Sequence, residues 1–110
     1  RRQRQMCIRD RPIIVTGDFN AVPSDEPIQV LTNPSDPRHL THSRTIAGFI
    51  YGPEWTFHDF GKIPYDKREW IDYIFVKGNI KVLRHGVLTE TLNNLFPSDH
   101  CPVISTLILE

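Results

Sequence analysis

Residues 70–76, with the sequence W-I-D-Y-I-F-V, decide the fold because they form the strongest β-strand pattern in the chain. Aromatic and β-branched residues dominate this stretch, and such residues favour a pleated, buried strand. The turn sequence K-G-N follows at residues 77–79, and we expect residues 80–83 to pair back on the strand as a hairpin.

Two further strands are predicted at the ends of the chain. Residues 12–16 (P-I-I-V-T) form a continuous apolar run, which predicts a strand buried on both faces and ending at Gly17. Residues 101–109 (C-P-V-I-S-T-L-I-L) predict a final strand, in which Pro102 is tolerated only near the beginning. Weaker strand signals lie near residues 46–51 and 55–58.

One short helix is predicted over residues 24–32 (S-D-E-P-I-Q-V-L-T). Ser24 can cap its beginning, and the acidic residues that follow suit the positive end of the helix dipole. Strands therefore outnumber helices, so the fold class is α+β or a β-sandwich with flanking helices.

Length and composition exclude several classes of protein. A chain of 110 residues forms one domain at most, and no apolar run approaches the ~20 residues of a membrane-spanning helix. The two cysteines, Cys7 and Cys101, are too few for a disulfide scaffold or a thiolate zinc site. There is no glycine-rich nucleotide-binding loop and no G-x-S-x-G nucleophile elbow.

The net charge of zero is the sum of a basic N-terminal segment, residues 1–11 (the basic head), and an acidic remainder, residues 12–110. Residues 1–11 hold five arginines and one aspartate, whereas residues 12–110 hold eight basic and twelve acidic side chains. The head has no apolar periodicity and no signal-peptide core. We expect residues 1–11 to be unstructured or artefactual, with a nucleic-acid-binding arm as the alternative.

Polar side chains follow or precede the predicted strands at three places. Asp18 and Asn20 come just after the first strand, Asp72 lies near the start of the central strand, and Asp99 and His100 precede the last one. If the first strand runs opposite to the other two, these groups meet at one rim of a sheet, where a scaffold can build a site.

Each group also has an ordinary structural interpretation. Asp18 and Asn20 can satisfy a turn through their own backbone, and Asp99 can do so beside an exposed His100. Asp72 shares a strand face with apolar residues, so it either faces water or needs a cationic partner such as an imidazolium. His39 and His42 are three residues apart, but no acidic third ligand is close, which disfavours a zinc site.

The motifs taken together, in this order, resemble the endonuclease/exonuclease/phosphatase superfamily. They are G-D-F-N at residues 17–20, T-F-H at 56–58, W-I-D-Y-I-F-V at 70–76 and S-D-H-C-P-V at 98–103. The resemblance runs from about Pro12 to Leu109. It implies a four-layer α/β sandwich, with two facing mixed β-sheets flanked by helices.

The resemblance also implies a metal-dependent hydrolase of phosphoester bonds, that is, a phosphodiesterase, a nuclease or a phosphatase. Asp18 would orient the attacking water or assist the leaving oxygen, and Asn20 would position the nucleophile or the phosphoryl group. Asp72 would orient the imidazole of His100, which would stabilise the transition state or act as the base. Asp99 would bind the metal, Mg²⁺ or alternatively Mn²⁺, which prefers such oxygen ligands.

A complete domain of this family is considerably longer than this chain. We therefore expect residues 12–110 to be the C-terminal half of such a domain, which would pack against the N-terminal half of the same domain. The expected substrate is a phosphoester, either a small molecule or a nucleic acid. The isolated fragment is expected to be inactive. The alternative is a non-catalytic module on the same scaffold that binds phospho-ligands or a protein.

Overall fold

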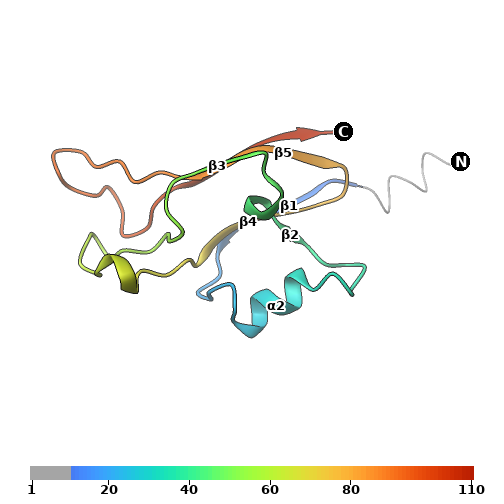
Figure 1. The fold of residues 1–110 in the computed structure, drawn as a ribbon, viewed down its shortest axis with the longest axis horizontal. Coiled ribbons are helices and arrows are strands. Elements are labelled where there is room, and N and C mark those ends of the chain that lie inside the picture. The colour runs from blue at the N-terminus through green and yellow to red at the C-terminus, as the bar shows by residue number, and fades with distance from the viewer. Residues whose placement is uncertain (1–10) are drawn as a thin grey trace, which may run out of the picture.

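The computed structural model describes residues 11–110, which form two three-stranded β-sheets with few helices (Figure 1). The first sheet has the strand order β1 (Ile13–Asp18), β4 (Asp72–Lys77), β2 (Thr41–His42). The second has the order β3 (Phe49–Tyr51), β5 (Ile80–Val87), β6 (Val103–Leu109). The helical elements are α2 (Glu26–Thr32), α3 (Ser43–Ile46) and the 3₁₀ helix η1 (Tyr65–Lys67).

The α+β class is confirmed, and the layers are those of a partial sandwich. Helix α2 lies on one side of the first sheet and the second sheet lies on the other (Figure 1). No helix within residues 11–110 has the length and apolarity that a membrane crossing requires. The expectation for the basic head falls, apart from Arg11, outside the described residues.

Strand β4 is the centre of the first sheet, as its sequence predicts. Tyr73 and Phe75 are fully buried on the face toward α2, and their rings stack with centroids 5.0 Å apart. Ile28 of α2 and the edge of the Phe19 ring complete this core. Burying large aromatic rings in this way stabilises the strand at the position where it carries Asp72.

The predicted hairpin is wrong. Strand β5 does not pair with β4; it pairs with β6, with Ile80 opposite Leu109. Gly78 adopts a positive φ of 94°, and the chain crosses there from the first sheet to the second. A short turn signal does not distinguish a strand that pairs back from one that joins a facing sheet, because both need the same reversal.

Strand β1 differs from its prediction in length and in burial. It extends to Asp18, and Ile13 and Ile14 are 42% and 46% exposed rather than buried on both faces. The reason is that the other described elements cover its two faces incompletely; it also lies at the edge of the sheet, paired within the described residues only with β4.

Smaller corrections concern the helix cap and the weak strands. The N-cap of α2 is Asp25 rather than Ser24, and the Asp25 carboxylate accepts a hydrogen bond from the Val22 amide. Residues 46–51 hold the end of α3 and the short strand β3. Residues 55–58 form only isolated bridges, through Phe57.

Candidate active site

Two aspartates face each other across the end of the first sheet. Strand β1 runs antiparallel to β4, and the last residue pair in register is Asp18 with Asp72. An antiparallel pair places the end of one strand beside the beginning of the other. The expectation that these carboxylates meet at one rim is therefore confirmed.

His100 joins them from the loop that precedes β6. Its Nδ1–H donates a hydrogen bond of 2.7 Å to Oδ2 of Asp72. On the opposite side of the ring, Nε2 lies 3.8 Å from Oδ2 of Asp18 and 3.9 Å from Oδ1 of Asp99. One oxygen of Asp18, one of Asp72 and one nitrogen of His100 all lie within 4.8 Å of one another.

The rim belongs to the sandwich and not to a single sheet, which corrects the sequence interpretation. Strands β1 and β4 lie in the first sheet, whereas β6, which His100 precedes, lies in the second. The site therefore forms only when the two sheets pack face to face, and it joins segments that are far apart in the sequence.

The surroundings of His100 favour its protonated form. Burial of the ring opposes the charge, but the hydrogen bond and negative charge of Asp72 and the charges of Asp99 and Asp18 outweigh it. The net effect is a raised pKa for His100. The imidazole is held with Nδ1 on a carboxylate and Nε2 toward the open side of the site, where it can donate or accept a proton.

The Asp18 carboxylate both accepts a hydrogen bond within the turn that follows β1 and faces the ring of His100. One of its carboxylate oxygens accepts the backbone N–H of Asn20 at 2.8 Å, and the other faces His100. Asn20 adopts a left-handed φ of 50°, a conformation that asparagine tolerates better than most residues. The structure thus brings Asn20 next to Asp18 through its backbone, while its side chain makes no hydrogen bond to the described residues of the cluster.

Thr56 is a positioning residue that the sequence analysis quoted within a motif but to which it gave no role. Its side chain is fully buried, and its hydroxyl accepts the backbone N–H groups of Ile71 and Asp72 at 3.1 and 3.2 Å. Its carbonyl accepts the N–H of Cys101 at 2.7 Å. Thr56 therefore ties the start of β4 to the residue after His100. No local sequence signal pointed to this role, because the contacts join residues 15 and 16 positions apart.

The neighbours of Thr56 hold the rest of the loop. The amides of His58 and Asp59 both donate to the carbonyl of Asp99, at 3.0 and 3.1 Å. The ring of Phe57 packs against His100, with 5.0 Å between the ring centroids. Residues 57–59 thus fix the backbone of Asp99 and the ring of His100 through these contacts.

The donor set at the rim fits a hard divalent cation. Asp18 and Asp99 present carboxylates whose side chains are 40% and 44% exposed, on the Nε2 side of His100. Magnesium uses oxygen ligands and takes only one or two carboxylates from a protein. His39 and His42 lie apart from this cluster: Nδ1 of His39 is 2.6 Å from the carbonyl of Asp36, and the ring of His42 packs against Trp70 and Tyr73.

Fold and site together define a class of protein, the two-sheet sandwich with an aspartate–histidine cluster at its rim. The sequence profile of the endonuclease/exonuclease/phosphatase family matches residues 2–100, and the chain belongs to this family. A search of curated proteins gave no significant match.

Solved structures of bacterial proteins resemble this fold along almost the whole chain. An endonuclease/exonuclease/phosphatase from Bacteroides vulgatus is 32% identical, with a TM-score of 0.83 over 99% of this chain and 41% of that one. A functionally unknown conserved protein from Enterococcus faecalis V583 is also 32% identical, with a TM-score of 0.78 over 99% and 41%. The mannosyl-6-phosphatase of Bacteroides thetaiotaomicron VPI-5482 is 29% identical, with a TM-score of 0.75 over 96% and 42%. The chain thus spans well under half the length of these relatives.

Proposed function

We propose that this chain carries the C-terminal part of the active site of a magnesium-dependent phosphoester hydrolase. The observation that carries the proposal is the placement of His100 between Asp72 at 2.7 Å and Asp18 at 3.8 Å. Family membership and the likeness to a phosphatase support a hydrolase of phosphoric esters. Several functional groups converging on one rim is also how catalytic scaffolds are built.

The side chains have the following roles in this proposal. Asp18 or His100 takes a proton from water, and the water oxygen forms a bond to phosphorus. The ester P–O bond breaks with its electron pair on the leaving oxygen, which takes up a proton from solvent and departs as the alcohol. The Asp72 carboxylate accepts the Nδ1–H of His100. The neutral ring then offers Nε2 as a proton acceptor, whereas the protonated ring, which the surrounding carboxylates favour, donates Nε2–H to the phosphoryl group. The Asn20 amide is proposed to position the nucleophile or a phosphoryl oxygen.

Asp99, with Asp18, would hold the magnesium ion, for which manganese is the alternative. When bound, the cation supplies positive charge that neutralises the phosphoryl oxygens. Because Asp18 and Asp99 both lie near Nε2, the protein places two negative groups around the position where a phosphate must bind. Like charges there would repel the substrate unless a cation or the protonated His100 offsets them.

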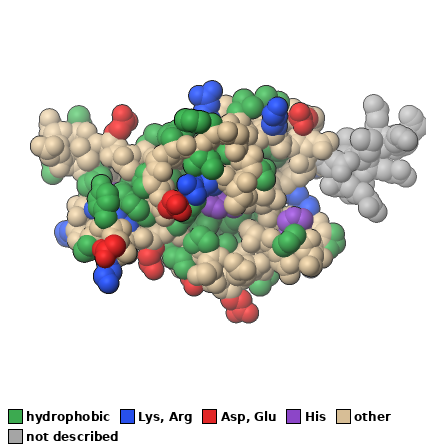
Figure 2. Space-filling view, viewed as in Figure 1, with side chains coloured by type: hydrophobic (Ala, Val, Ile, Leu, Met, Phe, Trp, Pro, Cys, Tyr) green, Lys and Arg blue, Asp and Glu red, His purple; other side chains and the backbone are tan. Residues whose placement is uncertain are grey.

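We favour a small phosphoester over duplex DNA as the substrate. Tight duplex binding requires clustered Lys and Arg, whereas residues 12–110 hold eight basic and twelve acidic side chains. On the face drawn in Figure 2 the two kinds of charge are interspersed. The relatives are more than twice as long as this chain, and their additional residues also contribute to the surface charge that a substrate meets.

We further propose that the 110 residues alone are inactive and require the N-terminal half of the same domain. The outermost strands carry exposed apolar residues, Ile13 and Ile14 on β1 and Ile104, Ile108 and Leu109 on β6. Exposed apolar patches of this kind mark surfaces that another part of a protein covers. Magnesium-dependent turnover by the isolated chain at the rate of the complete gene product would contradict this proposal.

The function is tested on the complete gene product that contains this chain. We expect it to hydrolyse a generic phosphodiester or monoester with added Mg²⁺ and to stop when the ion is chelated. Asp18→Ala, Asp72→Ala and His100→Ala should each lower kcat by about 10²–10⁴-fold, the usual contribution of an acid–base group. Glu110→Gln, at the exposed end of the chain, is the matched control. Unchanged rates in all three variants would end the proposal, and phosphate binding without hydrolysis would favour a binding module.

A further inference from the structure

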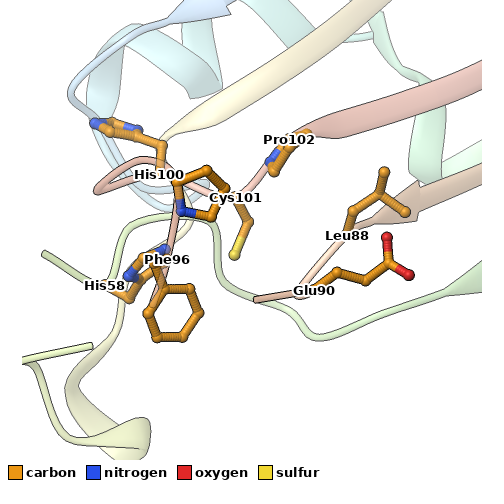
Figure 3. Close-up of a pocket in the computed structure, with 8 residues that line it drawn as sticks. His58, Leu88, Glu90, Phe96, His100, Cys101 and Pro102 are labelled. Atoms are coloured by element: carbon orange, nitrogen blue, oxygen red, sulfur yellow. The ribbon is translucent and has the colours of Figure 1, made fainter. Parts of the chain in front are cut away.

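The turn of residues 18–21 holds the Asp18 carboxylate on the Nε2 side of His100. Figure 3 shows the ring of His100 pointing away from the small cavity beside Phe96, so that cavity does not surround Nε2. The groups near Nε2 are instead the carboxylates of Asp18 and Asp99. The position of the turn therefore decides where one of these two carboxylates lies relative to a substrate.

The register of β1 and β4 ends at the rim, so the turn that follows β1 needs other anchors. One anchor is the backbone N–H of Phe19, which donates a hydrogen bond of 2.9 Å to the carbonyl of Ile71. The Phe19 ring packs edge-on against the rings of Tyr73 and Phe75, with centroids 5.7 and 5.2 Å apart. These contacts hold the chain just before Asn20.

The anchor on the other side of Asn20 is a side chain, the hydroxyl of Tyr73. It lies 2.7 Å from the carbonyl of Ala21 and 3.1 Å from the carbonyl of Trp70, and it donates its proton toward both. All three residues are buried, so solvent offers these carbonyls little replacement for the hydroxyl. Burial raises the pKa of the Tyr73 hydroxyl, which therefore keeps its proton and stays a donor.

Asn20 lies between the two anchors and transmits their constraint to Asp18. Its left-handed φ of 50° is a conformation that the surrounding structure must hold in place. Its N–H donates a hydrogen bond of 2.8 Å to one carboxylate oxygen of Asp18, and the other oxygen lies 3.8 Å from Nε2 of His100. A shift of the Asn20 backbone would therefore move both the Asn20 side chain and the carboxylate that faces His100.

We propose that Tyr73 is a positioning residue for the hydrolysis, and that its hydroxyl fixes the turn so that Asp18 and Asn20 face the substrate. The inference rests on the proposed function, because it assumes that these two groups take part in the reaction. Tyr73 acts through them and does not touch the substrate, since its ring is buried in the core with Ile28 of α2. Misplacement of a catalytic group by about 1 Å can cost about a hundredfold in rate, so a remote hydroxyl has leverage.

The first test removes only this hydroxyl from the complete gene product. Tyr73→Phe keeps the ring, and we expect it to lower kcat by about tenfold to a hundredfold while KM stays within about twofold. Tyr65→Phe removes a hydroxyl from an exposed ring and should leave kcat unchanged. Full kcat in folded Tyr73→Phe, or a loss confined to KM, overturns the positioning role. If the unaltered protein hydrolyses no phosphoester, the proposed function fails, and this role fails with it.

The second test determines whether Tyr73 acts through the turn. Asp18→Asn removes the carboxylate charge but keeps an oxygen for the Asn20 amide. In the Asp18→Asn background, Tyr73→Phe should lower kcat by less than about threefold, because residues that act as a unit are not additive. An equal loss of kcat in both backgrounds would show that Tyr73 acts independently of the turn and would overturn the inference.

Amide hydrogen exchange gives a third readout, which does not depend on activity. In folded Tyr73→Phe the amides of Phe19 and Asn20 should exchange about tenfold faster, while the amides of β4 keep their rates. Unchanged exchange at Phe19 and Asn20 would show that the hydroxyl does not hold the turn. The unaltered protein supplies a check without any variant: its Phe19 amide should exchange more slowly than the amides of residues 93 and 94 in an exposed turn. Equal rates there also overturn the inference.

Discussion

His100 and His85 lie in two different regions of the sandwich, and their surroundings shift the pKa of the imidazole in opposite directions. At the rim, three aspartate carboxylates approach the partly exposed ring of His100 within 4 Å, and its pKa is raised. In the interior, His85 is fully buried, and its Nδ1 lies 2.8 Å from the hydroxyls of Ser43 and Ser105. Burial, followed by the charge of Arg44, lowers its pKa to about 4.

The difference teaches which features of a histidine indicate chemistry. Both rings have a hydrogen-bonded Nδ1, so a partner alone does not distinguish them. Only His100 has negative charges on both sides and an open direction for a substrate. His85 instead stays neutral and packs with Trp70, with 6.3 Å between the ring centroids, which is a structural role.

The largest expected effect on activity comes from replacing each of the two histidines, in separate variants, with glutamine. His100→Gln should lower kcat of the complete gene product by about 10²–10⁴-fold, because it removes the proton-transfer group. His85→Gln should leave kcat nearly unchanged and lower the free energy of unfolding by ~1–3 kcal/mol, because buried hydroxyls lose their partner. Steady-state kinetics and urea unfolding measure the two effects. Equal loss of activity in both variants would abolish the distinction drawn between rim and interior.

A second experiment tests how the rim is held. Thr56→Val keeps the side-chain shape but leaves the buried amide of Ile71 and the partly buried amide of Asp72 without this acceptor. We expect a loss of ~1–3 kcal/mol in the free energy of unfolding for each unsatisfied amide, measured by urea unfolding. Thr56→Ser retains the hydroxyl and should recover most of the loss.

The same pair of variants separates a positioning role from a merely structural one. If Thr56 sets the distance between Asp72 and His100, Thr56→Val lowers kcat in conditions where the protein is still folded, with little change in KM. Full activity in a folded but less stable Thr56→Val protein would confine Thr56 to stability.

A third experiment uses the pH dependence of stability. Burial, followed by the charges of neighbouring cationic groups, lowers the pKa of both His42 and His85 to about 4. In the unfolded chain a histidine has its ordinary pKa of about 6.5. Between pH 6.5 and about 4 the unfolded state binds protons that the folded state does not, so stability falls as pH falls. Above pH 6.5 these two groups contribute no pH dependence. Urea unfolding at several pH values should show the decrease, and His85→Asn should reduce its slope. An unaltered slope would mean that carboxylates dominate this range.

Much of the site was predictable because its residues lie at strand ends. The apolar runs before Asp18 and after Asp72 predicted strands, and antiparallel pairing then required the two carboxylates to meet. The contact between His100 and Asp72 was also foreseeable, because a carboxylate on an apolar strand face needs a partner.

The features that the sequence did not predict depend on packing between residues far apart in the chain. The crossing from β4 to β5 follows a turn that resembles a hairpin, and only the pairing of Ile80 with Leu109 shows otherwise. The exposure of β1 reflects what covers its faces, which its own residues do not encode. The role of Thr56 arises from contacts with residues 15 and 16 positions away.

The smallest effect concerns the charge balance of the rim itself. Asp72→Asn removes the carboxylate that hydrogen-bonds Nδ1 of His100, while Asp18 and Asp99 keep their charges beside Nε2. Two of the influences that raise the pKa of His100 come from Asp72, the hydrogen bond and the charge, whereas burial of the ring opposes them. The pKa of His100 should therefore fall in this variant, and NMR titration of the ring protons in the complete gene product without added metal measures it. The ring of His85 serves as the internal reference, because it lies in the interior with its serine partners and should titrate as before. If His100 keeps its raised pKa in Asp72→Asn, then Asp18 and Asp99 control its protonation. Asp72 would in that case fix only the orientation of the ring.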